Sequence, residues 1–197
     1  MSVMPEPALS VTEKRARSQS ALVHPLDFFY ALSGLQLPSM DVVEPDAVPQ
    51  PYRGLLVHTS DMTSTLENFH GSSVHLRLLR REKRGDEYFR EVILLLEKPE
   101  KAVEFGAIKI NLPRFPREAR EQILQEHWPL GRILRTFNIA YRSRPAGFLR
   151  VSADSLISDA LHVPEGERLF GRRNNLLDLE DHPLAEIVEI LPPATES

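Results

Sequence analysis

The chain has 197 residues, of which 42% are hydrophobic and 26% are charged, a composition typical of one globular domain with a sizeable core. A formal net charge of −4 gives no attraction to phosphate backbones or anionic lipid, so neither nucleic acid nor membrane is expected as a partner. The absence of cysteine excludes thiol nucleophiles, disulfides and metal–thiolate sites.

The first 20 residues mix Pro, Ser, Glu, Lys and Arg without apolar periodicity, which predicts a flexible tail. They contain no apolar signal segment, and no stretch of the sequence approaches the roughly 18 apolar residues that span a bilayer. We therefore expect a cytoplasmic protein.

Residues 21–54 are expected to form an N-terminal helix and a proline-rich linker that pack on the main domain. Apolar residues between Leu26 and Leu35 have the spacing of a short amphipathic helix that ends near Gly34. Four prolines between Pro38 and Pro51 favour an extended segment over the surface. The main domain is assigned to residues 55–194.

The first half of that domain contains a helix, three strands and a second helix. Asp61 is a helix cap, and the following helix stops at Gly71. Alternation from Val74, the apolar run 88–96 and a further run ending at Pro113 predict an antiparallel meander. A helix from Pro116 to about residue 127 follows.

The second half is predicted to contain further strands, over residues 137–141, 148–151, 169–179 and 184–191. A tight turn at 181–183 joins the last two. Strands outnumber helices and pair as hairpins, which predicts an α+β fold with a mostly antiparallel sheet and flanking helices.

Cofactor and metal signatures are absent from the sequence. It has no glycine-rich phosphate loop, nucleophile elbow or EF-hand loop. The seven histidines include no i, i+4 pair that would place two ligands on one helix face. We expect neither a cofactor nor a metal ion.

Glu189 interrupts an apolar stripe on the last predicted strand, because it shares a face with Ala185, Ile187 and Leu191. A carboxylate there needs a partner or has its pKa raised by desolvation, and either condition suits a general acid or base. The alternative is that Glu189 lies on the exposed face of an edge strand.

Arg90 is a second charge on an apolar strand, on one face with Tyr88, Val92 and Leu94. Its planar guanidinium could bind the carboxylate of a ligand through two hydrogen bonds. The alternative is a cross-strand ion pair. Lys109 is a weaker candidate, which a lysine lying along the surface explains equally well.

Five sequence motifs resemble those of the chorismate pyruvate-lyases, in the same order and over about two-thirds of the chain. They are LLVHTSDMT at 55–63 (family LL…DSMT), YFREVILL at 88–95 (WLREILL), PLGRIL at 129–134 (PLGRYL), LFGRR at 169–173 (LWGRR) and EILPPA at 189–194 (ELFLPA). The resemblance implies an antiparallel sheet with helices around a closed ligand cavity.

The resemblance also assigns roles to individual residues. Met62 and Leu130 match positions that surround the product, Arg90 matches the carboxylate-binding arginine, and Glu189 matches the essential glutamate. Lys109, at a position where we expect arginine in the family, would help with a second carboxylate.

The function that the resemblance implies is elimination of pyruvate from chorismate to give a hydroxybenzoate, most simply 4-hydroxybenzoate, for quinone or other aromatic product biosynthesis. Arg90 would hold the ring carboxylate, and Glu189 would assist departure of enolpyruvate. The expected partners are chorismate and its aromatic product, bound by a monomer.

Two departures from the family keep a second function open. Residues 139–165 are longer than in typical lyases, and the first 50 residues have no counterpart. The alternative is a non-catalytic domain of the same fold that senses a small aromatic carboxylate, as in the ligand-binding domains of one group of bacterial transcription regulators. A structural or protein-interaction domain would require Arg90 and Glu189 to be exposed and far apart.

Overall fold

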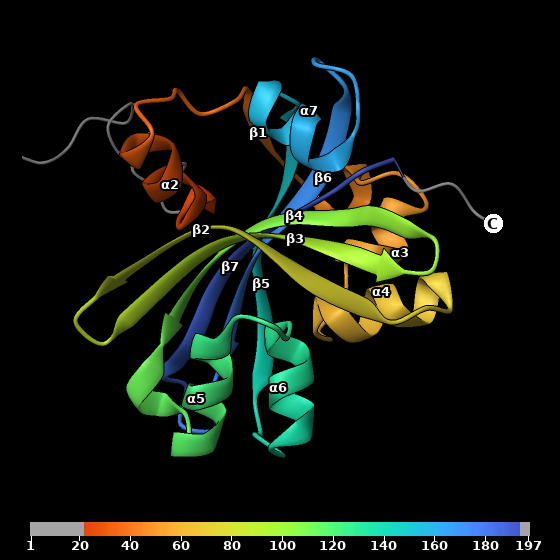
Figure 1. Ribbon diagram of the computed structural model, residues 1–197. Helices are drawn as coiled ribbons and strands as arrows, with labels where there is room; N and C mark the ends of the chain where they lie inside the picture. The colour runs from red at the N-terminus through yellow and green to blue at the C-terminus, as the bar shows by residue number, and fades with distance from the viewer. Residues whose placement is uncertain (1–21, 194–197) are drawn as a thin grey trace, which may run out of the picture.

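The computed structural model describes residues 22–193, so the tail expected over residues 1–20 lies outside the described residues. The described chain is an α+β fold with a seven-stranded sheet in the order β1-β5-β6-β7-β4-β3-β2, and every neighbouring pair is antiparallel (Figure 1). The predicted fold class is therefore confirmed.

The elements of the sheet and of its covering helices have the following bounds. The strands are β1 (Met40–Val43), β2 (Val74–Arg84), β3 (Glu87–Glu97), β4 (Glu100–Asn111), β5 (Arg142–Ser152), β6 (Arg168–Leu177) and β7 (Pro183–Leu191). The helices are α2 (Leu26–Leu32), α3 (Tyr52–Leu56), α4 (Met62–His70), α5 (Arg117–Gln125), α6 (Leu130–Thr136) and α7 (Ser155–Leu161), with short 3-10 helices at Pro45–Ala47 and Leu112–Arg114.

Helix α4 forms where the capping residues predict it. Asp61 is the N-cap, and its Oδ1 accepts a hydrogen bond from the Ser64 backbone N–H at 2.8 Å. Gly71 ends the helix in the left-handed conformation, with a φ of 61°. The meander β2-β3-β4 that follows is also confirmed, with β3 and β4 bonded along their whole lengths.

The segment 137–141 was predicted as a strand, and this prediction is wrong. Helix α6 ends at Thr136, residues 137–141 form a loop, and β5 begins at Arg142. The loop alternates apolar and polar residues because Phe137, Ile139 and Tyr141 pack partly buried against the core from outside the sheet. Because one side of this loop faces the core, its apolar residues alternate with polar ones in the same way as those of a strand.

The proline-rich segment between Pro38 and Pro51 contributes a strand to the sheet. Strand β1 pairs with β5 over four residues and forms one edge of the sheet. Helix α2 confirms the predicted short helix before it, with Gly34 at a φ of 66° just beyond its end. The segment is thus part of the architecture as well as a connection.

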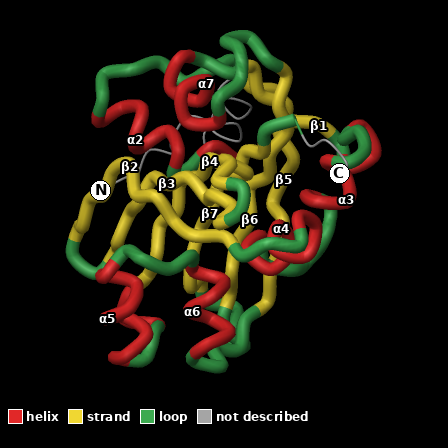
Figure 2. Tube along the Cα trace, turned by 45° about the vertical axis from the view of Figure 1, so that its right-hand side comes forward, coloured by secondary structure: helices red, strands yellow, loops and turns green. Residues whose placement is uncertain are grey.

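Helices cover both faces of the sheet (Figures 1 and 2). Helices α2 and α7 pack on one face with residues such as Phe89, Phe105 and Val188. On the other face α3 and α4 cover one apolar cluster, around Leu56 and Val92, and α5 and α6 cover a second, around Ile133 and Ile187. Polar side chains lie between these two clusters, and there a cavity opens.

Among residues 22–193 no helix has the length and apolar character needed to cross a membrane.

Candidate ligand-binding site

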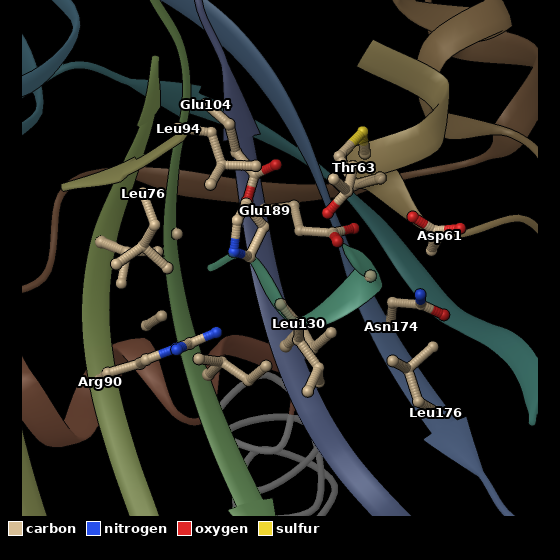
Figure 3. Close-up of a pocket in the computed structure, with 18 residues that line it drawn as sticks. Asp61, Thr63, Leu76, Arg90, Leu94, Glu104, Leu130, Asn174, Leu176 and Glu189 are labelled. Atoms are coloured by element: carbon tan, nitrogen blue, oxygen red, sulfur yellow. The ribbon is translucent and has the colours of Figure 1, made fainter. Parts of the chain in front are cut away.

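The cavity lies between the sheet and the first turns of α4 and α6, and about 50 Å³ of it is open to the centre of a water-sized molecule. Its walls are largely aliphatic. Six polar or charged side chains also reach it, from five different elements of the chain (Figure 3). The apolar lining is Met62, Leu76, Val92, Leu94, Ile108, Leu130, Leu176 and Ile187, and the polar lining is Asp61, Thr63, Arg90, Glu104, Asn174 and Glu189.

Arg90 projects from β3 into the cavity and is 1% exposed. Its Nε and Nη1 atoms are buried, and neither has a hydrogen-bond partner among the described residues. Burial lowers the pKa of the guanidinium to about 10, against the opposing effect of Tyr88 and Glu126, so Arg90 remains a cation at neutral pH. A buried cation without an anion is costly, which makes this end of the cavity a place for an anionic group.

Glu189 on β7 is fixed by an ion pair with Arg172, its cross-strand neighbour on β6. The Arg172 Nε donates to Glu189 Oε2 at 2.5 Å, and both residues are buried. The other nitrogens of the same guanidinium donate to the carbonyl oxygens of Leu56 at 3.2 Å, His58 at 3.3 Å and Ser60 at 3.2 Å. Arg172 thus ties the segment that leads into α4 to the centre of the sheet.

Glu104 on β4 is a second buried carboxyl group at the cavity, and it is 4% exposed. Its neighbour two residues on, Gly106, pairs with Glu189 in the sheet, so the two glutamates lie on the same face. Burial raises the pKa of Glu104 well above its usual range, Glu189 raises it further, and Arg172 opposes both effects. Its Oε2 atom is buried without a hydrogen-bond partner among the described residues.

The wall opposite the sheet depends on close contact between the starts of α4 and α6. Gly131 lies so near α4 that a Cβ atom there would stand 2.3 Å from Asp61 Oδ1 and 2.7 Å from Thr63 Oγ1. Only glycine fits this position. Met62 and Leu130, the first residues of the two helices, both line the cavity.

The structure brings four of the five candidate residues from the sequence to one cavity: Met62, Arg90, Leu130 and Glu189. The alternatives for the two charged residues do not hold. Arg90 has no ion pair within the described chain, and Glu189 is 3% exposed on a central strand. They are therefore neither exposed nor far apart, as an interaction domain would have required.

Lys109 does not line the cavity. Its side chain lies on the opposite face of β4, where the Nζ atom is 2.6 Å from Glu186 Oε1 and 3.1 Å from Glu87 Oε1. Two carboxylates already neutralise this lysine. Lys109 is therefore not placed to contact a ligand in the cavity.

Sequence reasoning missed Glu104, Arg172 and Asn174 as residues of this site. Glu104 interrupts the apolar run from Ala102 to Ile110 as Glu189 interrupts its own strand, and the same argument would have found it. Arg172 belongs to the LFGRR motif, but the pattern gives no indication that it pairs with Glu189. Asn174 is a polar residue in β6 whose amide donates to Ser143 Oγ at 3.0 Å.

No protein-family model matches the chain, and no curated protein matches its sequence. Solved structures with a similar fold do exist. The effector domain of PhnF from Mycobacterium smegmatis is similar at a TM-score of 0.54, with 14% identity over 67% of this chain and 88% of that one. PhnF itself gives a TM-score of 0.54, with 12% identity over 84% of this chain and 92% of that one.

A third similar structure is the ligand-binding domain of a regulator assigned to the GntR family, from Bordetella bronchiseptica. It has a TM-score of 0.48 and 15% identity, over 60% of this chain and 85% of that one. The two matches at a TM-score of 0.54 show the fold, which this chain shares with the effector domain of PhnF.

The expectation of a chorismate pyruvate-lyase that releases pyruvate and a hydroxybenzoate is wrong. The two similar structures at a TM-score of 0.54 are named as PhnF and its effector domain, and neither is named as a lyase. The geometry of Glu189 agrees with the correction, because the carboxyl group expected to donate a proton instead accepts a hydrogen bond from Arg172. The sequence motifs thus follow the fold and its cavity, and they do not establish catalysis.

Proposed function

We propose that this protein is a non-catalytic binding domain for a small aromatic carboxylate. The observation that supports the proposal best is Arg90, a fully buried guanidinium that faces an apolar cavity and has no ion-pair partner among residues 22–193. A ligand carboxylate would supply two hydrogen-bond acceptors in one plane, which is the geometry that a guanidinium binds most strongly.

The lining of the cavity suits such a ligand. Leu76, Leu130 and Ile187 offer aliphatic surface on which a ring can pack. The similarity of the fold to the effector domain of PhnF adds support for binding without turnover.

Titration calorimetry with benzoate tests the proposal. We expect binding to the unmodified protein, and a loss of affinity by roughly tenfold to a hundredfold in Arg90→Ala, because a charge-assisted pair is worth about 1.5–3 kcal/mol. Arg90→Lys keeps the charge but not the planar fork, and should bind with intermediate affinity.

Two controls accompany this titration. Arg150→Ala removes an arginine that forms a surface ion pair with Asp41, and it should leave benzoate binding unchanged. Benzamide has the shape of benzoate without its charge, and it should not bind. Equal affinity of benzoate for the unmodified protein and for Arg90→Ala would refute the proposal.

A further inference from the structure

The Glu104 carboxyl group lines the cavity, but binding of a ligand carboxylate by Arg90 does not account for it. Glu104 Oε2 is buried and lacks a hydrogen-bond partner among residues 22–193, although the residue belongs to the cavity lining. The other oxygen, Oε1, lies over Gly106, where a Cβ atom would stand 2.9 Å away. Figure 3 shows the Glu104 carboxyl group beside Glu189, at the end of the cavity away from Arg90.

Burial first, and then the charges around it, favour the protonated form of Glu104. Glu189 on β7 repels a negative charge on Glu104, and Asp61 at the start of α4 adds a third carboxylate to the lining. Arg172 on β6 is attractive, but it is already paired with Glu189. Arg90 on β3 lies at the far end of the cavity. In these surroundings Glu104 is most stable as a neutral carboxylic acid. The O–H group of that acid then needs a hydrogen-bond acceptor.

Strand register sets the distance between the two ends. Arg90 pairs with Ile108, and Ile108 is four residues from Glu104 on the same strand. Four residues correspond to roughly 13 Å along a strand. Arg90 and Glu104 therefore enter the cavity at different positions along the sheet.

We propose that Glu104 is a specificity-determining residue, which donates a hydrogen bond from its protonated carboxyl group to a neutral acceptor on the ligand. This inference rests on the proposed function, because the carboxylate of the same ligand lies on Arg90. The ligand is then a monoanion with an ether, carbonyl or hydroxyl oxygen opposite its carboxylate. A second carboxylate at that position is excluded, since the buried Glu189 carboxylate would repel it.

Three probes separate these contributions in calorimetry. Benzoate has no second polar group, 4-methoxybenzoate adds an oxygen that can only accept, and terephthalate adds a second carboxylate. The unmodified protein should bind 4-methoxybenzoate roughly threefold to tenfold more tightly than benzoate, as expected for one buried hydrogen bond, and should not bind terephthalate.

Two variants test the donor itself. Glu104→Leu removes the donor, so the preference for 4-methoxybenzoate over benzoate should disappear. Glu104→Gln keeps a donor in its amide, so the preference should remain. Circular dichroism and thermal unfolding serve as the test of folding for both variants.

The pH dependence gives an independent readout. As pH rises through the raised pKa of Glu104, the carboxyl group loses its proton and becomes an acceptor. The preference for 4-methoxybenzoate should therefore fall with rising pH in the unmodified protein and stay constant in Glu104→Gln.

The outcomes distinguish the two proposals. Benzoate binding that depends on Arg90, together with a 4-methoxybenzoate preference that Glu104→Leu leaves intact, would overturn the role of Glu104 alone. Binding of terephthalate to the unmodified protein as tightly as benzoate would do the same. Absence of Arg90-dependent benzoate binding would overturn both the proposed function and the inference drawn from it.

Discussion

Arg172 and Glu189 show how one buried ion pair organises this site. The guanidinium bonds the Glu189 carboxylate and three backbone carbonyl groups in the segment 56–60. Those carbonyl groups come directly before α4, so the position of the helix that closes the cavity depends on a side chain in the sheet. Arginine is suited to this task because its five N–H donors lie in a fixed plane.

We expect Arg172→Met to destabilise the protein by about 3–5 kcal/mol, because it leaves the Glu189 carboxylate buried without a counter-charge. Urea unfolding followed by circular dichroism measures the change. The double variant Arg172→Met/Glu189→Leu removes the stranded charge and should recover part of the lost stability. A double variant less stable than Arg172→Met alone would show that the pair is not the source of the effect.

At the scale of elements, the cavity exists because α4 and α6 meet at their first turns. Both helices are short, with nine and seven residues, and short helices gain most of their stability from packing and not from propensity. Gly131 makes the contact possible, and its neighbours Asp61 and Thr63 leave no space for a methyl group.

Gly131→Ala should therefore destabilise the protein by about 1–3 kcal/mol, the usual cost of overpacking, and weaken benzoate binding. Gly54→Ala is the matched control. Gly54 also lies in a helix, but the nearest atom to its Cβ position is Gln50 Oε1 at 3.6 Å, an ordinary contact. Alanine should stabilise that helix by about 0.5–1 kcal/mol. Thermal unfolding of both variants compares them, and equal melting temperatures would contradict the close contact at Gly131.

At the scale of the whole molecule, the N-terminal segment belongs to the folded unit. Leu26, Phe29 and Tyr30 of α2 are at most 1% exposed and lie in the core on the face opposite the cavity. The Tyr30 hydroxyl also donates to Asp154 Oδ2 at 2.8 Å, at the start of α7. A domain that starts at Leu55 would therefore lack α2, which forms part of the core.

A chain that begins at Leu55 should fail to fold cooperatively. Burial of the three side chains of α2 contributes about 1.5–3 kcal/mol each, and their sum approaches the total stability of roughly 5–15 kcal/mol that is usual for a domain. Loss of β1 also leaves β5 as an unpaired edge. Near-ultraviolet circular dichroism and a urea titration report the outcome. A sharp, full-length-like transition would show that residues 55–194 form an independent domain.

The sequence by itself determined the fold class, most of the strands, the helix between Asp61 and Gly71, and two charges placed on apolar strand faces. These features depend on neighbours along the chain, which caps, turn residues and the period of two record directly. The same local patterns predicted a strand at 137–141, since they cannot distinguish a loop packed on the core from a strand.

Only the tertiary structure decided the composition of the site. Arg90, Glu104 and Glu189 come from three strands, and their protonation and pairing depend on which charges the sheet order brings together. Because Glu189 pairs with Arg172, neither Arg90 nor Glu104 has an ion-pair partner within the part of the chain that the structure describes. Electrostatic energies in a buried cavity depend on distances between residues remote in the chain, and motif resemblance contains no such distances. For that reason the motifs led to the fold but not to the activity.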